Sequence, residues 1–99
     1  MRSDAFRESE AGRIARRQFI RCATSVGANY RAAQLARSKA EFIAKLQIAL
    51  EEADETVYWL EVASRANLLD FDAIHDLMSE ARELCAIFMS SLKTAKGIQ

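Results

Sequence analysis

Apolar residues recur every three or four positions along most of the chain, which is the spacing of one face of a helix. In the first third these positions are Phe19, Cys22, Ala23, Val26 and Tyr30. They predict a helix over residues 9–35. Residues 22–28 have unusually small side chains, and Gly27 among them costs about 1 kcal/mol of helix propensity. We therefore expect a neighbouring helix to approach closely there.

The second predicted helix begins with the clearest start signal in the chain. Ser38 and Glu41 form an S-x-x-E capping box, in which each side chain is expected to accept a hydrogen bond from an unpaired backbone N–H. The apolar positions that follow are Phe42, Leu46, Ala49, Ala53, Val57, Leu60 and Ala63. They predict a helix over residues 38–66, which we expect to end near Asn67.

The third predicted helix covers residues 70–95, with Asp70 as a good N-cap residue and Gly97 closing the C-terminal end. Its apolar positions are Phe71, Ile74, Leu77, Met78, Ala81, Leu84, Cys85, Phe88 and Leu92. The connections are short and the chain has no Pro, so neighbouring helices should run antiparallel. The expected fold is all-α: an antiparallel helical bundle of three long helices in a single domain, residues 1–99.

The compartment is expected to be the cytoplasm. No apolar run approaches the roughly 18 residues of a membrane span, so no membrane interaction is expected. Residues 1–10 are charged and lack the apolar core of a secretory signal. Cys22 and Cys85 lack metal-binding spacing and lie among apolar residues, so we predict buried free thiols.

The net charge of zero hides an asymmetry along the chain. Residues 1–45 contain ten basic and four acidic residues, and residues 46–99 contain four basic and ten acidic residues. Arg13, Arg17 and Arg21 lie four apart on one helix face, with Arg16 beside them. This stripe could bind nucleic-acid phosphates, but solvation or pairing with the acidic second helix is the favoured interpretation, because the whole chain is not basic.

Catalysis and cofactor binding are not supported by the residues. A di-iron bundle site needs two Glu-x-x-His pairs, yet His75 is the only histidine and Asp72 lies three residues before it. The acidic run around Glu51 and Glu55 is interpreted as a solvated face. A metal-dependent enzyme built on Glu51, Glu55 and His75 is the least favoured of three hypotheses, and we expect no metal, cofactor or enzymatic activity.

Several apolar side chains of the second helix fall outside its main apolar stripe. On a helical wheel these are Ile48, Tyr58, Trp59 and Val62. In a bundle of only three helices they would be exposed, and exposed apolar patches usually mark an interface. We therefore predict that they contact another protein chain.

Two linked stretches resemble a known family. They are RRQFIRCATSVGANYRAA, residues 16–33, and SKAEFIAKLQIALEEADETVYWL, residues 38–60, and looser similarity continues to about residue 96. They resemble the bacterial four-helix-bundle proteins that include those encoded in intervening sequences of 23S ribosomal RNA genes. The resemblance implies a ring-like homo-oligomer, often a pentamer, without an established enzymatic activity. A related branch resembles retroelement reverse-transcriptase accessory proteins that act with RNA, and Arg16, Arg17, Arg21 and Arg31 match its basic positions.

The chain departs from that family at its start. Members generally carry a further helix before the segment that matches Gly12 onward, and only eleven residues precede Gly12 here, so we expect the family's first helix to be missing or truncated. The residues predicted to be exposed on the resulting uncovered face are Val26, Tyr30, Phe88 and Leu92. The favoured function is a non-enzymatic oligomeric interaction or scaffold protein, and the alternative is an RNA- or nucleoprotein-binding accessory module that uses the arginine stripe.

Overall fold

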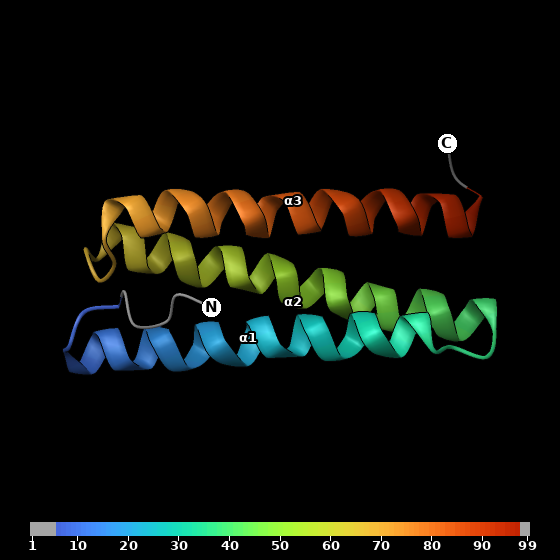
Figure 1. The fold of residues 1–99 in the computed structure, drawn as a ribbon, viewed down its shortest axis with the longest axis horizontal. Helices are drawn as coiled ribbons and strands as arrows, with labels where there is room; N and C mark the ends of the chain where they lie inside the picture. The colour runs from blue at the N-terminus through green and yellow to red at the C-terminus, as the bar shows by residue number, and fades with distance from the viewer. Residues whose placement is uncertain (1–5, 98–99) are drawn as a thin grey trace.

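The computed structural model describes residues 6–97, which form three antiparallel α-helices (Figure 1). They are α1 (Glu10–Gln34), α2 (Lys39–Arg65) and α3 (Phe71–Lys96). Each predicted boundary lies one residue from the observed one, and the all-α fold is confirmed. No strand occurs among the described residues, and a single antiparallel bridge joins Phe6 to Leu69.

Serine side chains cap the first two helices. Ser9 Oγ accepts a hydrogen bond from the Gly12 N–H at 2.9 Å, and Ser38 Oγ accepts one from the Glu41 N–H at 3.0 Å. The second half of the predicted capping box differs, because the Glu41 carboxylate accepts from the Arg37 N–H at 3.3 Å and not from the Ser38 N–H. Both contacts satisfy backbone donors that a helix start leaves unpaired.

The other helix ends lie next to the residues that the sequence predicted for them. Asn67 adopts the left-handed backbone conformation, with φ of 55°, directly after α2, and Gly97 does so after α3, with φ of 73°. Asp70 occupies the N-cap position of α3 but makes no capping hydrogen bond. Its carboxylate instead lies 3.5 Å from the Arg7 guanidinium, which ties the segment before α1 to the start of α3.

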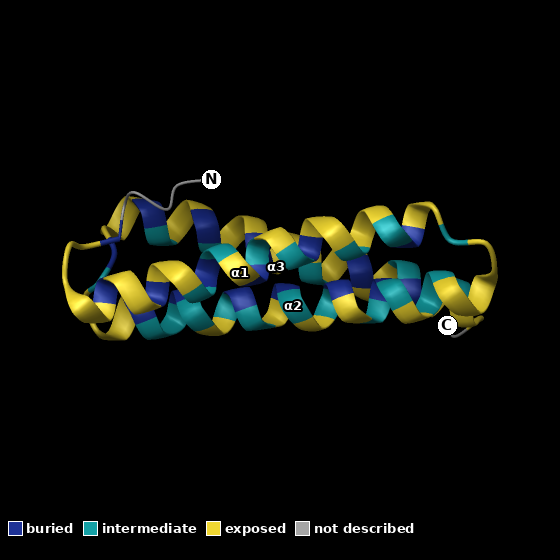
Figure 2. Ribbon diagram, turned by 90° about the horizontal axis from the view of Figure 1, so that it is seen from below, coloured by how far each residue is buried: buried dark blue, intermediate teal, exposed yellow. Residues whose placement is uncertain are grey.

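The middle helix, α2, packs along both of its neighbours, whereas α1 and α3 contact each other only weakly (Figure 1). The Cα envelope measures 44 × 23 × 16 Å, so the three helices form an elongated, shallow arrangement. Figure 2 shows buried positions recurring along each helix between exposed ones. Because α2 is the middle helix, α1 and α3 lie on either side of one face of α2.

The core consists of two clusters along the bundle axis. The first contains Phe6, Ala15, Phe19, Leu60, Ala63, Leu69, Ala73, Leu77 and Ala81. The second contains Val26, Ala33, Leu46, Ala49, Ala53, Phe88 and Leu92. Alanines supply much of the α2 contribution, so the helices can approach one another without large side chains between them.

The segment before α1 closes one end of the bundle. Phe6 is buried and its ring centroid lies 5.6 Å from that of Phe19, while the Arg7 N–H donates to the Leu68 carbonyl at 2.8 Å. Gly12 is required at the turn into α1, because a Cβ there would overlap the Arg7 carbonyl oxygen. The turn therefore holds this segment against the first core cluster.

Candidate interaction surface

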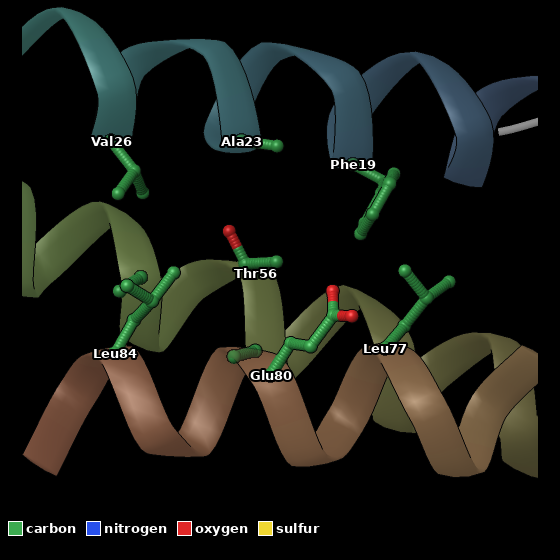
Figure 3. Close-up of a pocket in the computed structure, with 9 residues that line it drawn as sticks. Phe19, Ala23, Val26, Thr56, Leu77, Glu80 and Leu84 are labelled. Atoms are coloured by element: carbon green, nitrogen blue, oxygen red, sulfur yellow. The ribbon is translucent and has the colours of Figure 1, made fainter. Parts of the chain in front are cut away.

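An apolar groove runs between α1 and α3, with α2 as its floor. Its deeper part is a pocket of about 140 Å³ lined by Phe19, Ala23, Val26, Ala53, Thr56, Leu77, Glu80, Ala81 and Leu84. An adjoining pocket shares three of these residues and adds Gly27, Tyr30, Ile87 and Phe88. Figure 3 shows Glu80 extending from α3 toward α1, with the Thr56 hydroxyl as the other polar group among mostly apolar side chains. The two pockets form one continuous groove.

The four residues predicted to be exposed on the uncovered face do not all lie at the surface. Val26, Phe88 and Leu92 are buried in the second core cluster, so the prediction of exposure is wrong for these three. Their helix faces turn toward Leu46 and Ala49 of α2, which cover them. Tyr30 is 42% exposed, and its ring centroid lies 5.5 Å from that of Phe88.

Other apolar side chains therefore form the exposed edges of the groove. Leu84 is 39% exposed and Ile87 is 48% exposed, and both line it from α3. Sequence reasoning placed Leu84 in the core stripe and did not identify Ile87. The helical spacing alone could not separate residues that face α2 from those that face the groove.

A second apolar surface lies on the other side of α2. Ile48 and Tyr58 are exposed, as predicted. Trp59 and Val62 are instead half-buried, so the prediction of exposure is wrong for these two. The ring centroids of Tyr58 and Trp59 lie 5.3 Å apart, in an edge-on arrangement. The Trp59 indole N–H is buried and has no hydrogen-bond partner in the described part of the chain.

The predicted arginine stripe is divided by the fold. Arg21 lies 3.4 Å from Glu52 and 2.6 Å from Glu55, so it links α1 to α2. Pairing with the acidic second helix is thus confirmed for this arginine. The arginines left exposed, with no ion pair to any residue within 6–97, are Arg13, Arg16, Arg17 and Arg31.

Cys22, Glu52 and Glu55 come together around the Arg21 side chain. Their potential ligand atoms lie within 4.8 Å of one another, a grouping with no signal in the local sequence. Burial raises the pKa of the Cys22 thiol from 9.0 to about 11, and the Glu55 carboxylate adds to this effect while Arg21 opposes it. The nearby thiol and the two carboxylates raise the pKa of Arg21.

This grouping is an ion-pair cluster with poor chemistry for a metal. The Arg21 guanidinium contacts all three groups and already supplies the positive charge, including a 3.1 Å contact to Cys22 Sγ. Metal binding would need the thiolate, which the raised pKa of Cys22 disfavours at neutral pH.

The three residues of the least favoured hypothesis are not assembled into a site. His75 lies in a shallow pocket lined only by α3 residues, whereas Glu51 and Glu55 are on α2. No metal-type grouping among the described residues contains His75. Cys22 and Cys85 are free thiols, as predicted, with Cys22 buried and Cys85 half-buried.

These features define an all-α bundle with an uncovered apolar groove between its outer helices. The chain belongs to the 23S rRNA-intervening sequence protein family, whose model matches residues 3–90. Among solved structures it is similar to a protein of unknown function from the S23 ribosomal protein family of Bacteroides thetaiotaomicron, with 39% identity and a TM-score of 0.77. That match covers 81% of this chain and 71% of the other.

No curated protein matches the chain. Within the described residues, no helix has the length and apolar character needed to cross a membrane.

Proposed function

We propose that this chain is a non-enzymatic interaction protein that acts as a homo-oligomeric scaffold in the cytoplasm. The observation that carries the proposal is the groove between α1 and α3, which is mostly apolar and exposes Tyr30, Leu84 and Ile87 at its edges. The free thiols of Cys22 and Cys85 suit a reducing compartment.

Self-association has a direct physical drive in this chain. Covering apolar surface contributes roughly 25 cal/mol per Å², and exposed apolar patches of several hundred Å² usually mark interfaces. A second contact surface is available at Ile48 and Tyr58, on the other side of α2. Two different surfaces allow assemblies larger than a dimer, including the ring or pentamer that the family resemblance implies.

Light scattering across a concentration series tests this proposal. We expect the mass to rise above the 11.1 kDa of one chain as the concentration increases. Ile87→Lys should weaken assembly, because it places a charge in the groove. Leu35→Lys should not, because Leu35 is already 70% exposed outside the groove. A constant 11.1 kDa without binding of a hydrophobic dye would refute the proposal.

A second candidate function is RNA binding through α1. It is favoured by four exposed arginines of α1 that make no ion pair within residues 6–97, Arg13, Arg16, Arg17 and Arg31. Binding through phosphate contacts weakens with salt. The logarithm of the association constant for a structured RNA should therefore fall linearly with the logarithm of the salt concentration. Arg13→Gln with Arg17→Gln should reduce that slope, whereas Arg82→Gln on α3 should not.

A further inference from the structure

The deeper pocket of the groove arises from a pattern of side-chain size that both outer helices share. Each helix lines the pocket with a large apolar residue, an alanine and a second large apolar residue, at positions i, i+4 and i+7. These are Phe19, Ala23 and Val26 on α1 and Leu77, Ala81 and Leu84 on α3. Residues with this spacing lie on one face of a helix, so each alanine is a gap between two larger side chains.

The two gaps lie at the same level of the bundle. Helices α1 and α3 run in the same direction, and Figure 3 shows Phe19 and Leu77 at one end of the pocket and Val26 and Leu84 at the other. The ends are about 10 Å apart at 1.5 Å per residue. The pocket between them has a volume of about 140 Å³. An apolar cavity of about 150 Å³ can bind benzene, so this pocket has room for one six-membered ring.

One charged side chain lines the pocket. Glu80 lies one turn after Leu77, and its carboxylate extends toward α1 (Figure 3). The α1 residues that line the pocket are uncharged, and Glu80 makes no ion pair with any residue in the range 6–97. By helical spacing, the nearest arginine on that side of α1 is Arg16, about 9 Å further along the bundle. The carboxylate therefore borders apolar surface without a positive partner from the described chain.

The other polar group of the pocket is also an acceptor. Thr56 is buried, and its hydroxyl donates to the Glu52 carbonyl at 2.8 Å. With its single proton used in this way, the Thr56 oxygen can only accept a hydrogen bond from a molecule in the pocket. Because the Glu80 carboxylate also accepts, the pocket favours a ligand that donates hydrogen bonds and carries positive charge. A protonated amine has three donors, a positive charge and no acceptor.

We propose that this pocket binds small organic amines in their protonated form. An aromatic ring or a branched alkyl group of the amine lies between Ala23 and Ala81, and the ammonium group lies against the Glu80 carboxylate. The site goes beyond the proposed function, since it is formed within one chain. No other pocket of the described chain offers this combination. The adjoining pocket around Tyr30 has no charged residue, and the pocket around His75 is lined by α3 alone.

The apolar lining and the carboxylate have different roles in this site. Glu80 is exposed, and exposed ion pairs contribute little to affinity, so contact with the apolar lining should supply most of the binding. The charge instead supplies selectivity. It favours an amine over a neutral molecule of the same shape and repels a carboxylate.

Titrations with benzylammonium, benzyl alcohol and phenylacetate test the site. The three molecules share a benzyl group and differ in charge, and binding is followed through the backbone amide signals in NMR spectra at low salt. We expect benzylammonium to bind at least fivefold more tightly than benzyl alcohol, and phenylacetate to bind least tightly. The signals that shift should belong to residues around Ala23, Ala53 and Ala81, which line the pocket from the three helices.

Three variants separate the role of charge from the role of shape. Glu80→Gln should bring the dissociation constants of benzylammonium and benzyl alcohol within twofold of each other, with that of benzyl alcohol unchanged. The matched control is Glu83→Gln, which removes an exposed carboxylate of α3 that does not line the pocket, and it should keep the fivefold preference. Ala23→Leu fills the pocket and should abolish binding of both molecules. Circular dichroism would verify that each variant remains folded.

Several results would overturn the amine site. Equal binding of benzylammonium and benzyl alcohol to the wild-type chain would do so, as would a preference that survives Glu80→Gln. Unchanged affinity in Ala23→Leu, or shifted signals away from the pocket, would place the binding elsewhere and refute the site.

The same samples keep the amine site separate from self-association. Light scattering gives the mass of each sample, and the titrations use the lowest concentration of that series. A chain that stays monomeric yet binds benzylammonium selectively refutes the scaffold proposal and supports the amine site. A chain that assembles at higher concentration and shows no selective binding at the lowest one refutes the amine site alone.

Discussion

Truncating Leu60 should destabilise the fold by about 3–4 kcal/mol. Its side chain is fully buried, and it belongs to the cluster that contains Phe19, Leu69 and Leu77 from three parts of the chain. Leu60→Ala removes three carbons, worth about 2.4 kcal/mol at 0.8 kcal/mol per buried methylene. The residual cavity adds to this, within the 2–5 kcal/mol found for buried leucines. A domain of this size has roughly 5–15 kcal/mol of stability, so the variant should still fold.

Urea unfolding followed by circular dichroism would measure this loss at a fixed protein concentration, since assembly also affects stability. The midpoint should fall while the m-value stays constant. Leu35→Ala is the matched control, because Leu35 is 70% exposed and its truncation should cost less than about 0.5 kcal/mol. If Leu60→Ala loses no more stability than Leu35→Ala, the assignment of the core face of α2 is wrong.

Three further predictions follow from single residues. Ser38→Ala should destabilise the chain by about 1 kcal/mol in urea unfolding, because the Glu41 N–H loses its 3.0 Å acceptor. Burial raises the pKa of Cys22 from 9.0 to about 11, so its contribution to stability should be complete below pH 9.0 and should disappear as pH rises to about 11. Cys22→Ala should lack this alkaline loss, which is about 3 kcal/mol, and equal alkaline slopes in the two proteins would contradict the assignment. Gly27→Ala should raise the stability of the dilute protein by about 0.5–1 kcal/mol in thermal unfolding, since a Cβ there has open space; a fall would show a hidden steric contact.

The helices could be predicted closely because their signals are local. The serine caps at the starts and Asn67 and Gly97 at the ends act through backbone groups a few residues away. The apolar period supplies the rest, since a chain without Pro contains no competing break. Local hydrogen bonding and periodicity therefore specify where each helix begins and ends.

Local signals could not predict which edge of each apolar stripe is exposed to solvent. Val26 and Phe88 line the groove but are buried in the core cluster with α2. Only the pairing of three helices determines that Tyr30 and Ile87 form the exposed edges of the groove. A helical wheel describes one helix at a time. It contains no information on the angle between two neighbours, and that angle decides which flanking residues remain exposed.

The ion-pair cluster of Arg21 with Glu52 and Glu55 could not be predicted from the sequence, because it also depends on how two helices pack together. Arg21 meets Glu52 and Glu55 across 31 and 34 residues, through the antiparallel register of α1 and α2. The charge asymmetry of the chain indicated that such pairing was available, but the register selects the partner. Arg13 and Arg17 share the helical spacing of Arg21, yet neither pairs with another described residue.

The opposite charges of the two halves of the sequence are partly paired with each other in the fold and partly left exposed. Part of the asymmetry is neutralised inside the chain, where Arg21 faces the acidic residues of α2. The remainder lies on helices that α2 separates: Arg13 and Arg16 are exposed on α1, and Glu80 and Glu83 are exposed on α3.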